Sequence, residues 1–309
     1  MTLQGSCPSE IRPGSQDEHA GPQDEVVVVT DSAASLPSDA VAALGVHVVP
    51  MTLEVGGSVY PDGALDPAAV VQRASHLRVT TSAPSPGAYL EALAAAGSRP
   101  VVVTTVARRT SASYESALAA AGYRRAGRVE VVDTQTAAGG QGLVVMAAAR
   151  AARSGNSLEE VATTARAVAA RVRLLAFLEQ LDSLARSGRV PGVAARAGRS
   201  LGARAVFELT RGRVRSRRPA RTLDGAVGRI MAACAAGSQA GARLRAAVLE
   251  AQAPCGAEAL LAAVHELAPD ADVYRAPFSS VMVAHTGPGL AGLAWWWEPS
   301  PQSPSPPAS

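Results

Sequence analysis

The sequence predicts an α/β fold in two domains: an α/β/α domain on a parallel sheet, then a two-layer α/β domain on a mixed sheet. Short apolar, β-branched runs alternate with alanine-rich helical stretches, and these runs are continuously hydrophobic, as in parallel strands buried on both faces. An Arg-Gly pair at 211–212 separates two later strand-like runs, which indicates a hairpin and hence a mixed sheet. The predicted domains span 26–170 and 171–297.

The elements of the first domain follow from this alternation. A capping serine, Ser85, followed by Pro86 marks the start of one helix. Strands are predicted at 26–30, 46–49, 101–105 and 129–132, and helices at 36–44, 66–77, 86–96, 110–121 and 137–153. The polar residues 1–25 are expected to be a disordered leader, and the Pro/Ser-rich residues 298–309 an extended tail.

The second half is predicted to begin with a helix at 158–170, near the domain boundary, and to continue with strands close to hairpins. Strands are predicted at 173–179, 204–209, 214–217, 246–251, 271–274, 281–285 and 290–295, with helices at 222–235 and 256–267. Such a pattern favours a mixed sheet with helices on one face.

Composition excludes several kinds of chemistry. All 29 basic residues of the 309-residue chain are arginine, and the absence of lysine excludes a Schiff-base lysine and a Walker-A phosphate loop. Cys7, Cys234 and Cys255 form no metal-binding or disulfide spacing. No secretory signal is visible, and no apolar run reaches the roughly 20 residues that span a membrane. We therefore expect a cytoplasmic protein without a metal site or cofactor and with at most transient membrane contact.

Two motifs raise alternatives. Residues 198–202 (GRSLG) match the nucleophile elbow of α/β-hydrolases, and His285 follows in the required order, although no strand-like run precedes Ser200. A serine hydrolase using Ser200 and His285 is therefore one alternative. His285 is expected at the end of a buried strand, beside the glycine-rich turn 287–292, whose GPGLAG pattern lacks the following helix and acid of a dinucleotide site.

Positive charge is concentrated between Arg150 and Arg221, a stretch that contains 16 arginines and only five acidic residues. This excess fits phosphates, an acidic partner or nucleic acid, and equally a solvated surface in a chain whose only cation is arginine. Aromatic residues are 4% of the chain, too few for the stacking platform of a single-strand binder. We therefore expect no nucleic-acid partner.

Hydroxyl groups lie at the ends of predicted strands, at 30–32, 104–105 and 133–134, and before a predicted helix, at 80–85. Ligands of parallel α/β sheets bind at the carboxyl ends of the strands, where short hydroxyls and helix N-termini hold anions. The pattern indicates a site for a small anion such as a carboxylate.

A series of motifs, in this order, resembles the DegV family of bacterial fatty-acid-binding proteins. The segments are distributed over nearly the whole folded part of the chain, from Val26 to Gly292. They are VVVVTDSAASLP from Val26, VVPMTLEVGGSVYPDG from Val48, TTSAPSPGAYLEAL from Thr80, SASYESA from Ser111, VEVVDTQTAAGGQGLVV from Val129, LDSLARSGRV from Leu181 and VAHTGPGLAG from Val283.

The resemblance implies that a long-chain fatty acid lies in a tunnel between the two domains. It implies a non-enzymatic, acyl-carrying subunit of a bacterial fatty acid kinase, which presents the carboxylate to a separate ATP-dependent kinase for acyl-phosphate formation in phospholipid metabolism. The resemblance implies that the carboxylate is bound by Thr80, with Thr81 and Ser82 adjacent, and by His285. Arg189 matches a family arginine that is either structural or faces the kinase.

One departure concerns the carboxylate. Where the family has two serines, this chain has Ala107 and Arg108, and the glycine of the next motif is Ala112. Arg108 either pairs with the carboxylate or points to solvent. The change also leaves open a different small carboxylate as the ligand.

Overall fold

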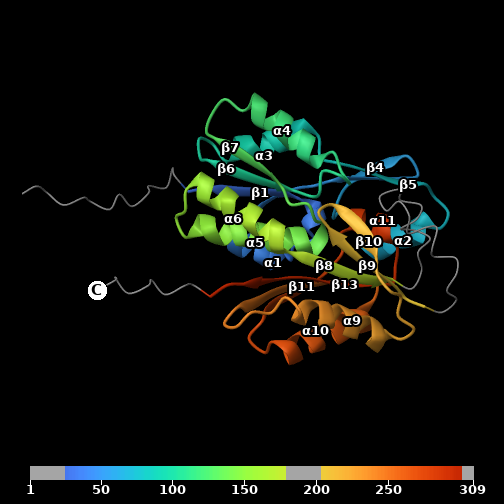
Figure 1. The fold of residues 1–309 in the computed structure, drawn as a ribbon. Helices are drawn as coiled ribbons and strands as arrows, with labels where there is room; N and C mark the ends of the chain where they lie inside the picture. Colours follow the sequence, from blue (N-terminus) through green and yellow to red (C-terminus); the bar gives the residue numbers. More distant parts are fainter. Residues whose placement is uncertain (1–24, 179–202, 301–309) are drawn as a thin grey trace, which may run out of the picture.

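The structure is a computed structural model that describes residues 25–178 and 203–300. Its elements stack in five layers (Figure 1). Helices α3 (Pro86–Ala95) and α4 (Ser113–Tyr123) cover a parallel sheet, and α5 (Ala138–Arg153) and α6 (Leu158–Arg171) lie between this sheet and a mixed sheet. Helices α9 (Leu223–Ala235) and α10 (Pro254–Leu267) cover the far face of the mixed sheet.

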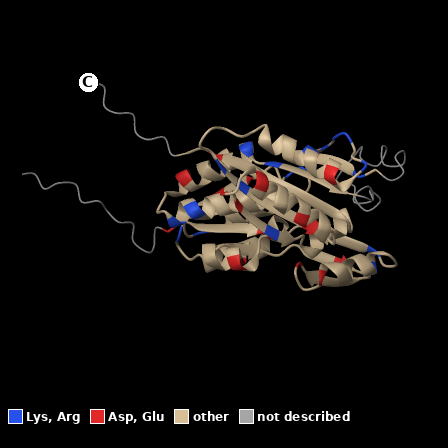
Figure 2. Cartoon of the chain, turned by 90° about the horizontal axis from the view of Figure 1, so that it is seen from below, with Lys and Arg blue, Asp and Glu red and all other residues tan. Residues whose placement is uncertain are grey.

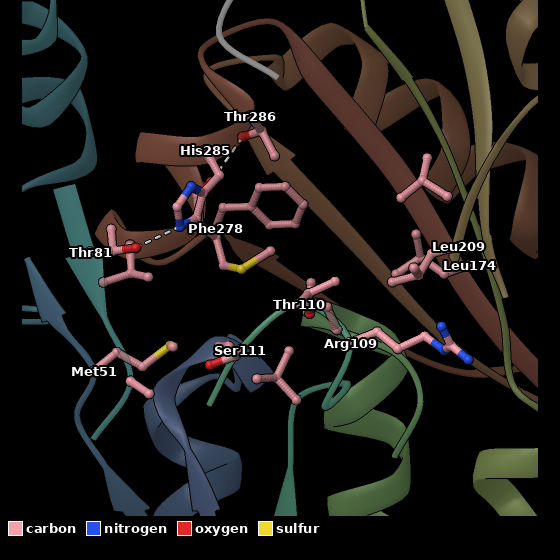
Figure 3. Close-up of a pocket in the computed structure, with 18 of the residues that line it drawn as sticks. Met51, Thr81, Arg109, Thr110, Ser111, Leu174, Leu209, Phe278, His285 and Thr286 are labelled. Carbon is pink, nitrogen blue, oxygen red and sulfur yellow. Dashed lines mark hydrogen bonds between the residues drawn. The ribbon is translucent and has the colours of Figure 1, made fainter. Parts of the chain in front are cut away.

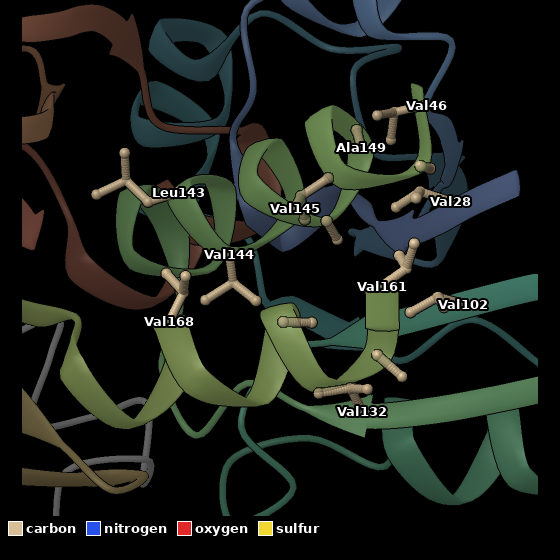
Figure 4. Packing of buried hydrophobic residues seen from close by; sticks show 14 of the residues in the cluster. Val28, Val46, Val102, Val132, Leu143, Val144, Val145, Ala149, Val161 and Val168 are labelled. Carbon is tan, nitrogen blue, oxygen red and sulfur yellow. The ribbon is translucent and has the colours of Figure 1, made fainter. Parts of the chain in front are cut away.

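The parallel sheet confirms the four strands expected from the apolar runs. Its order is β2 (His47–Val49), β1 (Val27–Asp31), β6 (Val101–Thr105) and β7 (Val129–Asp133), and all its pairings are parallel. Short helices η1 (Ser32–Ala34) and α1 (Ser38–Leu44) connect β1 to β2. Alternate side chains point to opposite faces: Val28 packs against α5 and α6 (Figure 4), and Val29 against the α3 side. Each fully buried valine stabilises the fold by about 1.5–3 kcal/mol, which is why both faces are apolar.

A second, three-stranded antiparallel sheet was not expected. Strand β3 (Thr52–Val55) pairs with β4 (Ser58–Pro61) on one side and β5 (Val79–Ser82) on the other. Helix α2 (Pro67–Ala74), capped by the Asp66 carboxylate, connects β4 to β5. These strands are short and partly exposed, and Val59 is 68% exposed, so they lack the apolar run of a core strand.

The mixed sheet has the order β10-β9-β8-β13-β11-β12. The strands are β8 (Arg173–Leu178), β9 (Ala205–Thr210), β10 (Arg213–Ser216), β11 (Arg243–Ala251), β12 (Asp272–Pro277) and β13 (Leu290–Glu298). The predicted hairpin is confirmed: β9 and β10 are antiparallel, and Arg211 and Gly212 both have positive φ angles, as this tight turn requires. Only β11 and β12 pair in parallel.

The predicted strand at 281–285 is wrong, because this segment is helix α11 (Ser280–Thr286). The Ser279 hydroxyl caps it by accepting a hydrogen bond from the Met282 N–H at 3.4 Å, and Gly287, at φ +71°, ends it. A short apolar run fits a buried strand or a buried helical turn equally well, so contacts elsewhere in the fold decide between them. The predicted glycine-rich turn follows it through Gly287 and Gly289, both at positive φ, and ends where β13 begins at Leu290.

Helix α5 approaches the mixed sheet closely at a glycine. At Gly139, in the first turn of α5, a Cβ atom would lie 2.8 Å from the Cβ of Ala247 on β11. Beyond it, Ala247, Ala294 and Trp296 of the mixed sheet share one apolar core with α5, α6 and the parallel sheet. This packing fixes α5 and α6, and with them the parallel sheet, against one face of the mixed sheet.

Candidate ligand-binding site

A cavity of about 750 Å³ lies where the carboxyl edge of the parallel sheet meets the mixed sheet. Its volume is within the usual range for a small-molecule site. The apolar part of its wall comes from β8, β9, β10 and β13, and from the segment that leads into α11; it includes Leu174, Phe207, Leu209, Val214, Phe278 and Leu290. The cavity surface is therefore mainly hydrophobic, although its lining also includes hydroxyl and charged side chains: Thr81, Ser82, Arg108, Arg109, Thr110, Ser111, Glu115, His285 and Thr286.

The most defined polar pair in the cavity is formed by Thr81 and His285. The Thr81 Oγ1 lies 2.7 Å from the His285 Nε2, and both residues line the cavity and are half-buried. Thr81 comes from β5, and His285 from the last turn of α11, not from the end of a strand as expected. Figure 3 places this pair at the end of the cavity opposite Leu174, Leu209 and Arg109. The sequence prediction thus named two residues, 204 positions apart, that the fold brings into contact.

Thr80, the residue to which the resemblance assigns the carboxylate, does not line the cavity. Its hydroxyl donates a hydrogen bond to Glu54 on β3 at 3.1 Å, and it is not among the lining residues. Successive side chains of a strand point to opposite faces, so once Thr81 faces the cavity Thr80 points away. Ser82 does line the rim and is exposed.

Arg108 extends from the loop between β6 and α4. Its guanidinium lies 3.3 Å from the Glu115 carboxylate and 4.9 Å from the centre of the Tyr114 ring, and its side chain is 56% exposed. Arg108 contributes to the cavity wall, but its charged group points to solvent rather than toward a carboxylate in the cavity. Arg109 also lines the cavity, at the far end, beside Gly212 of the β9–β10 turn.

Ser111 is a cavity-lining hydroxyl that the sequence analysis did not single out. Its Oγ lies 2.9 Å from the Ser113 Oγ at the start of α4. Because Ala112 provides no side-chain cap for α4, this pair of serines orders the beginning of the helix.

A buried carboxylate supports the loop beneath the cavity. Asp31, at the end of β1, is fully buried and accepts hydrogen bonds from the Val106 N–H at 3.0 Å and the Gln141 Nε2 at 2.9 Å. Burial raises the pKa of Asp31, while these hydrogen bonds and that from the Ala33 N–H act to lower it. Asp31 joins three elements at the carboxyl edge and so fixes where the cavity loop begins.

Two residues named by the sequence predictions lie outside the described residues. One is Arg189, for which the resemblance implies a structural role or a contact with the kinase. The other is Ser200, the nucleophile of the hydrolase alternative. Among the residues described, no three or more His, Cys, Asp and Glu side chains group together as a metal would require. None of the helices in that part of the chain is long and apolar enough to cross a membrane.

The arginine excess is distributed over several elements. Arg150 of α5 pairs with Asp272 at 2.7 Å, Arg166 of α6 with Glu130 at 2.5 Å, and Arg173 of β8 with Glu208 at 2.8 Å. Figure 2 shows basic and acidic residues interspersed over the face seen from below. Part of the excess is therefore neutralised locally.

Comparison with known proteins gives a consistent result. Residues 25–298 match the family model described as "Uncharacterised protein, DegV family COG1307". A DegV domain-containing protein of Streptomyces coelicolor is 32% identical over 274 residues, covering 87% of this chain and 97% of its relative. One from Mycobacterium tuberculosis is 30% identical over 272 residues, covering 87% and 96%.

Solved structures of the same family share the fold. A DegV family protein from Thermus thermophilus, described for its fatty acid binding, has a TM-score of 0.83 and 30% identity, covering 88% of this chain and 99% of its own. DegV of Bacillus subtilis, described as a fatty acid binding protein, has a TM-score of 0.80 and 23% identity, covering 89% and 100%. The parallel sheet, the mixed sheet and the match over nearly all of the folded chain show that this protein belongs to the DegV family.

Proposed function

We propose that this protein binds a long-chain fatty acid in the cavity between the two sheets and presents its carboxylate to a separate ATP-dependent kinase for acyl-phosphate formation. The observation that carries the proposal is the cavity of about 750 Å³ with an apolar wall and one hydroxyl–imidazole pair. The fatty acid binding described for the Thermus thermophilus relative, at 30% identity, supports it.

The apolar wall supplies the affinity in this scheme. Each methylene group moved from water to the cavity contributes about 0.8 kcal/mol, so even a partly buried acyl chain gains several kcal/mol. Leu174, Phe207 and Leu290 offer apolar side chains to this wall, and Arg109 lies at its far end. The hydrocarbon chain is therefore expected to extend from the Thr81–His285 pair toward Leu174 and Leu209 (Figure 3).

The Thr81–His285 pair holds the carboxylate. A buried anion without hydrogen-bond donors is strongly unfavourable, so the acid end needs the polar end of the cavity. In the tautomer with hydrogen on Nε2, His285 donates to the Thr81 Oγ1 across 2.7 Å and leaves the threonine O–H directed to the ligand. The exposed Ser82 lies beside this end, which supports access of a partner enzyme to the carboxylate.

The first experiment is native mass spectrometry of the purified protein, followed by solvent extraction and identification of bound lipid. One fatty acid per chain is the expected result. An empty protein that also takes up no added fatty acid overturns the assignment, and short carboxylic acids then become the ligands to test. Labelling by a fluorophosphonate probe, lost in Ser200→Ala, would favour the hydrolase alternative instead.

The matched test of the site compares neighbouring threonines. Thr81→Val removes the hydroxyl that faces the cavity and is expected to raise the fatty acid Kd about tenfold or more, since a hydrogen bond to a charged group is lost. Thr80→Val removes the same group from the opposite face of β5 and is expected to leave the Kd unchanged. Equal effects of the two substitutions would contradict the placement.

The kinase step is tested by reconstitution. Fatty acid kinase and labelled ATP are expected to give acyl phosphate only when the loaded protein is present, and the Thr81→Val protein is expected to give less. Acyl phosphate formed equally well without this protein would overturn the presenting role.

A further inference from the structure

We propose that Asp62 is a positioning residue for ligand binding, which sets the orientation of His285 by fixing the first turn of α11. The inference rests on the proposed function, because it concerns how the carboxylate-binding pair is held. Asp62 is not among the residues that line the ligand cavity, so any effect it has on binding passes through other residues.

The Asp62 carboxylate joins three parts of the fold. Its Oδ1 accepts a hydrogen bond from the Val281 N–H at 3.0 Å, and its Oδ2 accepts one from the Ser32 hydroxyl at 2.7 Å. The Ser32 Oγ in turn accepts from the Met51 N–H at 3.0 Å. One carboxylate therefore connects η1 after β1, and through Ser32 the residue before β3, to α11, which lies 219 positions away from Asp62 in the sequence.

The helix needs such an anchor because it is short. Helix α11 has seven residues, too few to be stable by itself in water, so contacts outside it decide its orientation. At its N-terminal end the Val281 N–H is held by Asp62, and the Ser280 hydroxyl donates to the Leu65 carbonyl. At its C-terminal end His285 meets Thr81.

Because α11 is a helix, fixing its first turn also fixes the position of the His285 imidazole in its last turn. Val281 and His285 are four residues apart, about one turn or ~6 Å along the axis, and so lie on the same face. Both line the ligand cavity. Fixing the backbone N–H of Val281 fixes the rotation and axial position of this face, in addition to the buried packing of Val281 and Val283. Asp62 thus keeps the Nε2 of His285 at hydrogen-bond distance from Thr81 before the ligand arrives.

A double-mutant cycle on fatty acid affinity tests the proposal. Asp62→Ala is expected to raise the Kd about tenfold in the wild-type protein, as loss of a charge-assisted hydrogen bond predicts, and to add almost nothing in a His285→Ala background. Effects that multiply in the double variant would overturn the proposal, because Asp62 would then act independently of His285.

Three further variants separate positioning from general destabilisation. Asp62→Asn keeps an acceptor for the Val281 N–H and is expected to stay within about threefold of the wild-type Kd. Asp39→Ala removes an exposed aspartate of α1, whose carboxylate bonds only to the neighbouring Ala40 N–H among the described residues, and is expected to have no effect. Ser32→Ala replaces Asp62→Ala in the cycle if the latter does not fold. A loss in Asp62→Asn as large as in Asp62→Ala would overturn the hydrogen-bond argument.

A measurement on the ligand-free protein keeps this inference distinct from the proposed function. Imidazole NMR signals of His285, assigned by their loss in His285→Ala, are expected to shift in Asp62→Ala and to stay in place in Asp39→Ala. If the protein binds no fatty acid, the proposed function fails, and this shift still decides whether Asp62 positions His285. Unchanged His285 signals in a folded Asp62→Ala protein would overturn the positioning role.

Discussion

Adding one methyl group where α5 packs on the mixed sheet is predicted to destabilise the protein. In Gly139→Ala the new Cβ would lie 2.8 Å from the Ala247 Cβ and 3.2 Å from the Leu249 Cγ. Neither neighbour can relieve this overlap by a side-chain rotation. The position of the Ala247 Cβ is set by the backbone of β11, and Leu249 is buried, with 3% of its surface exposed. Overpacking of this kind costs about 1–3 kcal/mol, more than the helix-propensity gain of up to ~1 kcal/mol from replacing glycine.

The matched control is Gly228→Ala in the middle of α9. This glycine is exposed, and a Cβ built on it meets nothing within 4 Å. Only the propensity term remains there, so Gly228→Ala is expected to stabilise by about 0.5–1 kcal/mol. Thermal and urea unfolding followed by circular dichroism measure both, and each kcal/mol corresponds to a Tm change of roughly 2–4 °C in a chain of about this size. If Gly139→Ala were as stable as Gly228→Ala, the close contact between α5 and β11 would be refuted.

Two further predictions concern titratable groups. Burial disfavours the charge on Glu208, but the Arg173 and Arg217 guanidinium groups outweigh it and lower its pKa. A lowered acid pKa stabilises the fold above the ordinary value of 4.5, and this stability is lost on acidification through the folded pKa. Urea unfolding at a series of pH values should therefore show a weaker acid dependence in Glu208→Gln; an unchanged profile would contradict the ion pairs. Burial raises the pKa of Cys234 to about 12, so a maleimide at pH 8 is expected to label the exposed Cys255 and spare Cys234 in the native protein, as peptide mapping measures. Labelling of Cys234 at the rate of Cys255 would refute its burial.

Local sequence patterns predicted the regular elements well where burial on two sides leaves a continuous apolar run. The strands at 101–105 and 129–133 and the helix that begins after Ser85 are examples, because their signals are contained within a few adjacent residues. The hairpin at Arg211–Gly212 was predicted equally well, because the turn requires positive φ angles and glycine adopts them easily.

The errors have a common cause. Strands β3, β4 and β5 form one sheet by pairing β3 with residues up to 30 positions away, and no periodicity within a single strand indicates that pairing. The apolar run from Val281 became a helix because Ser279 and Asp62 accept hydrogen bonds from its first turn. Of the adjacent residues Thr80, Thr81 and Ser82 that were all expected at the site, Thr81 and Ser82 line the cavity, and His285 comes from a helix end rather than a strand end.

By itself, the sequence determined the α/β class, the order of the main elements and the two partners of the polar pair in the cavity, near Thr80–Thr81 and at His285. Only the tertiary structure decided which of the adjacent threonines faces the cavity, where the charge of Arg108 points, and how α11 is anchored. The physical reason is that side-chain direction on a strand reverses at every residue and depends on register, which is fixed by long-range pairing and burial rather than by local composition.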